Sequence, residues 1–383
     1  MSPDSTAGDR GPAPTAPTED PHSPPQAADD AHRTAVATVP RPAGEEAVRG
    51  RRGHTTRRVA GLAFGAVLLL ATAVASIAVG ARFVPPSVVL DALLSPADVG
   101  DHVVIRELRV PRTILGLAVG AALGTAGTLM QSLTRNPLAD PTILGVSQGA
   151  AFGVVIAISL LGIGNPAIYV WFAFAGAGLA SMAVYTLGSG RSGATPVRLA
   201  LAGIALGAVL HALSSALLRI DTETYERMRF WMSGSLAGQT ADVIAVLVPI
   251  MVVGVCCALF LAWPLNALAL GDDTGRALGA GVGRTRLLTG LAITVLAGAA
   301  TAATGPIWFV GLAVPHAVRS VVGPDLRWVL PFSALFTPIL LLGSDVVGRV
   351  LGSPGEVQAG IVCAVIGAPV FIALARRRKL PAL

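Results

Sequence analysis

The chain of 383 residues is 53% hydrophobic and only 13% charged, and its formal net charge is +6. Since soluble domains carry about 25% charged residues, this composition excludes a soluble globular protein and predicts an integral membrane protein with many spans. Lys379 is the only lysine, and no glycine-rich loop precedes it, so the sequence also excludes ATP hydrolysis through a P-loop.

The first 55 residues predict a disordered cytoplasmic tail. They are rich in Pro, Ala, Thr, Asp and Glu and almost lack large apolar residues, so they cannot bury enough surface to offset the entropy of ordering. A basic cluster at residues 49–58 (RGRRGHTTRR) precedes the first apolar run, and Arg376–Lys379 close the last one. The positive-inside rule then places both termini in the cytoplasm. Because both clusters adjoin spans, nucleic acid is not an expected partner.

Apolar runs of about 20 residues predict transmembrane helices. The resulting fold class is an all-α membrane protein, a polytopic bundle of about ten such helices. The ten runs are 59–81, 113–133, 143–163, 167–187, 197–218, 242–263, 286–303, 307–322, 329–349 and 357–375.

Counting from a cytoplasmic N-terminus puts residues 264–285 inside and residues 83–111 outside. Arg106, Arg109 and Arg112 then lie on or beside the outer side, against the positive-inside rule. This placement suggests that some of these arginines serve a purpose at the outer surface.

The segment Leu265–Gly279 (LNALALGDDTGRALG) carries three charges between two apolar runs, so it must leave the membrane. Gly271 can end one short helix, and Asp272 or Asp273 can N-cap the next. The pattern favours two short amphipathic helices shaped to contact another protein, although an ordinary connecting loop fits it equally well.

Two further features concern the interior of the bundle. Gly305-Pro306 and Pro315 interrupt apolar runs, and a broken backbone at membrane depth requires cover by protein or by a water-filled cavity. Gln131 is a lone polar residue in an apolar run. We interpret it as an interhelical hydrogen-bonding group, with a pathway-lining role as the alternative.

The strongest motif is Leu108–Ala150, LRVPRTILGLAVGAALGTAGTLMQSLTRNPLADPTILGVSQGA. With it, residues 56–380 resemble the FecCD-type permeases, the membrane subunits of type II ABC importers for iron chelates and cobalamin. Further matching strings are LAGIALG (201–207), FWMSGSL (230–236), GPIWFVGLAVPH (305–316) and IGAPVF (366–371).

The resemblance implies that Leu265–Gly279 forms two coupling helices that bind a cytoplasmic ATPase subunit. It therefore favours the hypothesis of a protein-binding segment over that of an ordinary connecting loop. ATP hydrolysis would then belong to that separate subunit, and the chain itself would be no enzyme and need no cofactor. The implied coupling residues are Leu265, Asn266, Leu268, Leu270, Gly271, Asp272, Asp273, Arg276, Leu278 and Gly279.

The resemblance also implies an extracytoplasmic substrate-binding protein that docks through Arg–Glu pairs. The matching arginines are Arg109, Arg112 and Arg349. A local pair between Arg349 and Asp345, one helical turn earlier, is the alternative, and both roles can coexist. Glu356 falls where the family often has a glutamate, but the residues that follow it depart from the family pattern, which leaves its role open.

The pathway in relatives runs between two permease subunits, so the resemblance implies a homo- or heterodimer in the membrane lipid. The matching pathway and gate residues are Thr195, Pro196 and His211, although a lone histidine on an apolar face is more often a packing residue.

The implied activity is uptake of iron chelates, most often ferric siderophores, across the cell membrane by alternating access. Cobalamin or haem import by the same mechanism is the first alternative. An ion-coupled secondary transporter is the second, but the spans hold almost no ionisable residue near their middle. No paired carboxylates, metal-spaced histidines or nucleophile constellation suggest a membrane enzyme or a metal site.

Overall fold

The computed structural model describes residues 43–80, 84–95, 97, 100–190, 193, 194 and 196–376. The chain divides into two units, Met1–Gly53 and His54–Leu383, and the helical bundle belongs to the second. Residues 1–42 lie outside the described residues, so the disorder expected there stays a prediction. Residues 43–55 are helical, as the beginning of α1 (Ala43–Ala78), where the sequence had suggested the end of the tail.

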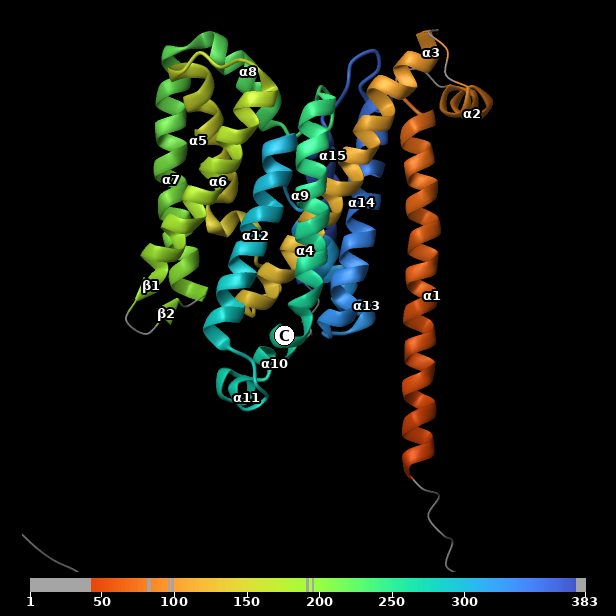
Figure 1. Ribbon diagram of the computed structural model, residues 1–383, viewed down its shortest axis with the longest axis vertical. Helices are drawn as coiled ribbons and strands as arrows, with labels where there is room; N and C mark the ends of the chain where they lie inside the picture. The colour runs from red at the N-terminus through yellow and green to blue at the C-terminus, as the bar shows by residue number, and fades with distance from the viewer. Residues whose placement is uncertain are drawn as a thin grey trace, which may run out of the picture. The chain divides into compact units, whose positions relative to one another are not determined.

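Ten helices coincide with the ten predicted spans (Figure 1). Among the described residues, seven helical stretches are long and apolar enough to cross a membrane, and three shorter apolar helices accompany them. These ten helices are α1, α4 (Val110–Thr134), α5 (Val146–Val155), α6 (Pro166–Gly188), α7 (Pro196–Ile220), α9 (Ala241–Phe260), α12 (Val282–Thr304), α13 (Val310–Val322), α14 (Leu326–Leu351) and α15 (Ala359–Ala375).

Shorter elements connect the spans at the two ends of the bundle. Figure 1 shows α2, α3 and α8 at one end and α10, α11 and the strand pair at the other. Their bounds are α2 Pro86–Leu94, α3 Gly100–Val103, η1 Val104–Arg109, η2 Pro141–Leu144, η3 Ile156–Leu160, β1 Ser189–Gly190, β2 Gly193–Ala194, α8 Thr222–Met232, α10 Ala262–Ala269 and α11 Asp272–Ala277. The two-residue strands pair antiparallel, with Ser189 opposite Ala194.

Helix α4 is the centre of the bundle and packs against α9, α12, α13 and α14. Its small residues permit this because they let neighbouring backbones approach. A Cβ on Gly120 would lie 2.4 Å from the Pro338 Cα of α14, and one on Gly127 would lie 1.7 Å from the Gly311 carbonyl oxygen of α13. The GAALGTAG motif therefore shapes two helix crossings.

The Gln131 side chain forms the hydrogen bond between helices that the sequence analysis predicted. It is fully buried, and its Nε2 donates a hydrogen bond of 3.1 Å to the Leu312 carbonyl of α13. The polar group therefore joins α4 to the short helix beside it.

Between α12 and α13 the backbone is not helical, as the Gly305-Pro306 break predicted. Gly305 has φ of 72°, and a Cβ there would lie 2.0 Å from the Trp231 carbonyl oxygen. Phe309 also has a positive φ, 67°, directly before α13. The Thr304 carbonyl accepts a hydrogen bond of 2.8 Å from the Ser235 N–H. Protein thus covers this break, which allows a short helix of 13 residues to complete the crossing.

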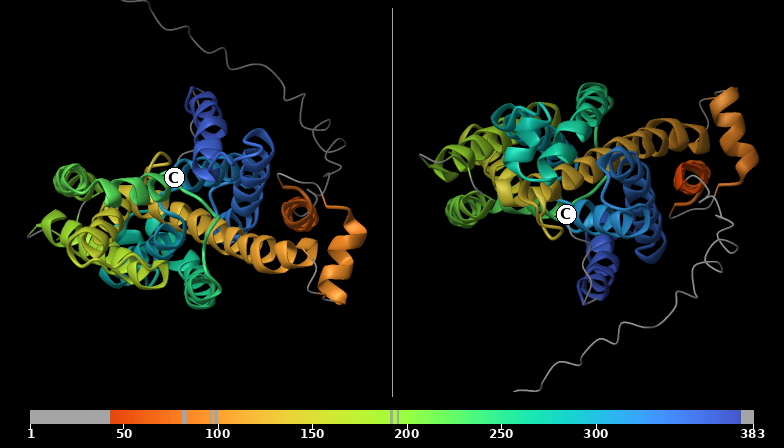
Figure 2. Two further views of the ribbon diagram at one scale, coloured as in Figure 1. Left: turned by 90° about the horizontal axis from the view of Figure 1, so that it is seen from above. Right: turned by 90° about the horizontal axis from the view of Figure 1, so that it is seen from below.

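Arg58 of α1 and the segment α10–α11 lie on the same side of the bundle. Arg58 donates to the Val322 carbonyl at 2.7 Å, and Asn266 of α10 bonds to Asp325 at 2.6 Å, so both reach the turn between α13 and α14. Helix α14 crosses away from this turn and α15 returns, which brings the end of α15 to the same side. Figure 2 shows α1 at the edge of the bundle, and only 11% of its most apolar stretch of 18 residues is buried.

Candidate coupling and docking sites

The segment Leu265–Gly279, called here the coupling segment, contains the two short helices that the sequence predicted. Helix α10 ends at Ala269 and α11 begins at Asp272. Gly271 between them has φ of 111°, a conformation that side chains rarely adopt. The predicted cap by an aspartate is wrong: Gly271 occupies the N-cap of α11, and Asp272 and Asp273 lie in its first turn.

Asp272 anchors the coupling segment to the ends of two membrane helices. Its Oδ1 accepts from Arg135 Nη2 at 2.7 Å, and its Oδ2 accepts from Arg286 Nη2 at 2.8 Å. Arg135, which caps the C-terminus of α4 with φ of 49°, also donates to the Leu268 carbonyl at 2.6 Å. The position of α11 is therefore tied to both α4 and α12.

A second anchor joins α10 to the beginning of α14. Asn266 Nδ2 donates to Asp325 Oδ1 at 2.6 Å, and its Oδ1 accepts from the Leu326 N–H at 3.0 Å. Leu265 and Leu268 are buried on the same side of the segment. Movement of the coupling segment would thus pull on three long membrane helices at once.

The opposite side of the coupling segment is exposed and combines apolar and charged groups. Leu270 is 68% and Leu278 is 51% exposed. The side chains of Asp273 and Arg276 are 97% and 60% exposed and pair with each other at 2.6 Å. Exposed leucines beside charges are typical of a protein-binding surface. Gly279, at the end of the segment, has φ of 87° and forms a turn.

At the other end of the bundle, the structure brings together the three arginines assigned to docking. With Asp345 and Glu356 they form what we call the outer arginine cluster. Arg109 Nη1 donates to the carbonyls of Ile77 and Ala78, both at 2.8 Å. Arg349 Nη1 donates to the carbonyls of Ser76 and Val79, both at 2.9 Å. Both arginines therefore hold the end of α1, and their role in docking stays a prediction.

Asp345 is the charge that this cluster is built around. It is fully buried, and it pairs with Arg112 at 2.7 Å and with Arg349 at 3.1 Å. The local Arg349–Asp345 pair that the helical spacing offered is thus confirmed. Arg112 also pairs with Glu356 at 2.8 Å, and the Glu356 side chain is 39% exposed. Glu356, whose role the sequence left open, therefore links Arg112 to the surface.

A cavity of about 470 Å³ lies beside the outer arginine cluster. Arg109, Arg112 and Arg349 line it together with Glu107 and Glu356, and Gly238 and Gln239 also belong to its lining. The cavity carries charges of both signs at the end of the bundle opposite to the coupling segment.

The pathway and gate residues do not form a cluster in the described part of the chain. Thr195 lies outside the described residues, and Pro196 is the first residue of α7. His211 is exposed in the middle of α7, and only 11% of the most apolar window of this helix is buried. No other described part of the chain therefore covers the face of α7 that carries His211.

Sequence reasoning missed the residues that hold the coupling segment in place. These residues are Arg135, Arg286 and Asp325, none of which the sequence analysis singled out. The available signal was weak, because an arginine after a helix and an aspartate before one are common at membrane boundaries. Their contacts join residues 14, 59 and 137 positions apart, for Arg286–Asp272, Asn266–Asp325 and Arg135–Asp272 respectively.

Comparison with known proteins gives consistent matches. The model of the FecCD transport family matches residues 68–377. The ferric enterobactin transport system permease protein FepD of Escherichia coli is 47% identical over 84% of this chain and 96% of its own length. A probable siderophore transport system permease protein of Bacillus subtilis, YfiZ, is 40% identical over 81% and 94%.

Two further matches extend the comparison. The cobalamin import system permease protein BtuC of Halobacterium salinarum is 40% identical over 74% of this chain and 76% of its own length. A solved structure described as an inward-facing conformation of a metal-chelate type ABC transporter superposes with a TM-score of 0.69. It is 31% identical and covers 82% of this chain and 98% of the solved chain.

Proposed function

The chain belongs to the FecCD transport family, and from this premise we propose that it is the permease subunit of an ABC importer for ferric siderophores. The observation that carries the proposal is the coupling segment. It is anchored to α4, α12 and α14 on one side and exposes Leu270 and Leu278 on the other. A chain without a P-loop needs an external source of energy, and this surface suits the ATPase that would supply it.

The proposed mechanism uses the anchors as a linkage. Nucleotide-driven closure of two ATPase subunits moves the coupling segments that they hold. The contacts of Asp272 and Asn266 pass this displacement to α4, α12 and α14. The ATPase can shift the permease between its states only through a difference in contact energy between those states.

The coupling segment defines the proposed orientation. It faces the cytoplasm in this proposal, and both termini lie on its side of the multi-pass membrane protein. Arg135, Arg284, Arg286 and Arg327 at this end support that assignment by the positive-inside rule.

A second permease subunit completes the proposed pathway. The scarcely buried helix α7, with His211 on its open face, supports a partner at this surface. Thr195 and Pro196, of which Pro196 is the first residue of α7, remain our candidates for the cytoplasmic gate.

A substrate-binding protein docks on the opposite end in this proposal. The cavity with Glu107, Arg112 and Glu356 supports a polar contact there. Of the three arginines, Arg109 and Arg349 are buried and hold α1, so Arg112 with its partner Glu356 is the pair that a docking protein can reach.

The siderophore assignment rests on the relatives, because the matches to siderophore permeases extend over more of both chains than the match to a cobalamin permease. The test is uptake into proteoliposomes that contain this chain, its ATPase and its binding protein. We expect uptake of a radio-iron-labelled ferric siderophore that requires ATP. Uptake that persists without ATP would refute the importer assignment, and ATP-dependent uptake of cobalamin alone would refute the substrate.

A further inference from the structure

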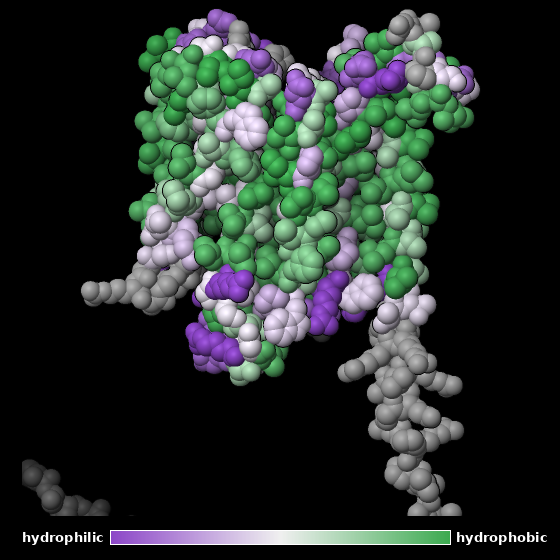
Figure 3. Space-filling view, in the orientation of Figure 1, coloured by the Kyte–Doolittle hydropathy of each residue, from purple (hydrophilic) through white to green (hydrophobic). Residues whose placement is uncertain are grey.

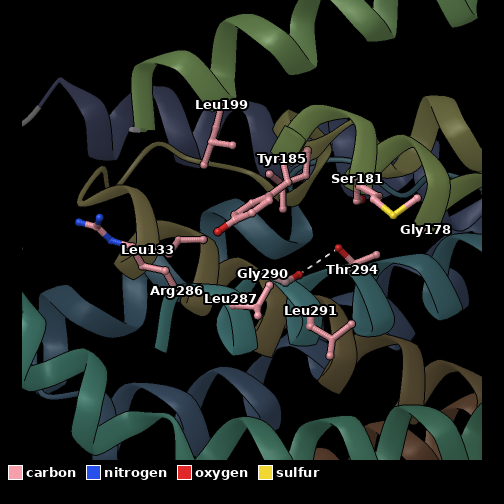
Figure 4. Close-up of a pocket in the computed structure, with 12 residues that line it drawn as sticks. Leu133, Gly178, Ser181, Tyr185, Leu199, Arg286, Leu287, Gly290, Leu291 and Thr294 are labelled. Atoms are coloured by element: carbon pink, nitrogen blue, oxygen red, sulfur yellow. Dashed lines mark hydrogen bonds between the residues drawn. The ribbon is translucent and has the colours of Figure 1, made fainter. Parts of the chain in front are cut away.

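A second cavity, of about 360 Å³, lies between α6 and α12 near the coupling segment (Figure 4). Its walls are mostly apolar, with Leu287 and Leu291 from α12 and Met182 from α6. These three side chains are between 55% and 60% exposed. The cavity is therefore a groove on the outside of the helices, and of the residues of the two sites described above it shares Arg286 with the coupling site.

The polar groups of this groove are arranged in steps along the membrane normal. Arg286 lies at the end nearest the coupling segment, and Gly290 and Thr294 follow at intervals of one helical turn, about 6 Å each. On the antiparallel α6, Tyr185 and Ser181 follow in the same direction. The ring of Tyr185 reaches into the cavity, whereas Arg286 extends away from it (Figure 4). The sequence from charge to hydroxyl groups to apolar surface matches a phospholipid from phosphate to ester to acyl chain.

One buried hydroxyl in the groove has no hydrogen-bond partner among the described residues. Ser181 is only 6% exposed, and its Oγ makes no hydrogen bond to any described residue. A buried hydroxyl that stays unsatisfied costs about 1–3 kcal/mol. Thr294, which lines the groove from α12, uses its own hydroxyl to donate to the Gly290 carbonyl at 2.9 Å. Ser181 is therefore the group at this depth that a ligand acceptor would satisfy.

Charge at the rim selects the headgroup. Arg135 and Arg286 share the single carboxylate of Asp272, and the exposed Arg284 stands two residues before Arg286. Arg286 uses only Nη2 in its contacts with Asp272. The rim thus keeps a net positive charge at the boundary between apolar surface and water, where basic pockets between transmembrane helices bind anionic headgroups. Figure 3 shows hydrophilic residues gathered at this end beneath a largely hydrophobic belt.

We propose that this groove binds one anionic phospholipid. Its phosphate contacts Arg286, and its glycerol ester region lies beside Tyr185 and Ser181, with Leu287 and Leu291 on the facing wall. One acyl chain continues past Gly178, which follows Ser181 along α6 in the lining. Since Arg286 also holds Asp272 of α11, the lipid site adjoins the coupling segment through one shared side chain.

The test measures lipid retention and does not depend on transport. The full chain is purified in detergent, offered dioleoyl-phosphatidylglycerol or dioleoyl-phosphatidylcholine, and analysed by native mass spectrometry. We expect the anionic lipid to be retained about fivefold more, the factor that one basic residue provides at a membrane surface. Equal retention of both lipids would overturn the proposal.

Glycines supply variants that fill the groove without clashes. A Cβ on Gly178 or Gly290, both in the lining, would meet no atom within 4 Å. Gly178→Leu and Gly290→Leu should therefore fold and lose the preference for phosphatidylglycerol. Gly343→Leu on α14, where a Cβ also meets nothing within 4 Å, is the matched control and should keep it.

The rim has its own test. Arg286→Gln should reduce the preference, and Arg286→Lys should preserve it. If both filling variants retain the anionic lipid as the unchanged chain does, then the lipid binds elsewhere or the groove accommodates a protein helix, and the proposal fails.

Discussion

The outer arginine cluster and the coupling segment lie at opposite ends of the same helices and handle charge in opposite ways. In the outer cluster Asp345 is fully buried and Arg349 is 2% exposed, and the charges are paired inside the chain. In the coupling segment Asp273 is 97% exposed, and Asp272, the anchor, is 31% exposed. Both regions stood out in the sequence as charges beside apolar runs.

The difference shows that the burial of a charge near a membrane helix decides whether it stabilises the fold or contacts another protein. A buried pair contributes to the fold because loss of one partner leaves the other uncompensated at low dielectric. An exposed pair contributes little to the fold and remains available for contact with another protein. Substitutions in the two regions should therefore separate into those that unfold the chain and those that uncouple it.

Asp345→Ala should have the largest effect on stability. It leaves the buried Arg349 without its carboxylate partner and leaves Arg112 with Glu356 alone, and loss of a buried partner costs about 3–5 kcal/mol. The measurement is the unfolding free energy of the purified chain in detergent. Asp273→Ala is the control and should leave this free energy unchanged. Equal stability of the two variants would remove the contrast between the regions.

Leu270→Asp should have the largest effect on transport with the fold intact. Leu270 is 68% exposed on the coupling segment, and the loss of an apolar contact residue from a protein interface costs about 2 kcal/mol or more, which is at least tenfold in affinity. We expect ATP-driven uptake to fall at least tenfold while the unfolding free energy stays constant.

The control is Leu161→Asp, at the opposite end of the bundle, where the leucine is 55% exposed. If Leu161→Asp reduces uptake as much as Leu270→Asp does, the coupling segment is not the special surface that we assign.

The sequence predicted the number and positions of the membrane helices well because apolar runs, glycine breaks and basic flanks are local signals. It also predicted the break at Gly271 and the pair Arg349–Asp345, which lies within one helical turn. It did not predict that Arg109 and Arg349 bind the carbonyls at the end of α1. Those contacts join residues more than 30 positions apart, and no local pattern records them. The prediction of an aspartate at the N-cap of α11 was wrong. Gly271 occupies the N-cap, and Asp272 pairs with Arg135 and Arg286 instead.

The pair between Arg135 and Asp272 should give an intermediate result. Their side chains are 43% and 31% exposed, so solvent weakens the 2.7 Å contact. A double-mutant cycle with Arg135→Gln and Asp272→Asn should yield a coupling energy of about 0.2–1 kcal/mol in unfolding. The same cycle for Arg349 and Asp345 should yield more. A larger value at the coupling segment would mean that its anchor is as rigid as the buried cluster.

The smallest effect on the fold is expected from the pair Asp273–Arg276. The two groups contact each other at 2.6 Å, yet both are mostly in water, and screening by salt weakens such pairs further. Asp273→Asn and Arg276→Gln should leave the unfolding free energy unchanged at low and at high salt. Their effect should emerge only in binding of the ATPase, as a slower association that depends on ionic strength. Since Leu270 and Leu278 remain in these variants, the complex should still form. A loss of stability without a slower association would mean that these exposed charges stabilise the fold. The proposed difference between the two ends of the molecule would then be wrong.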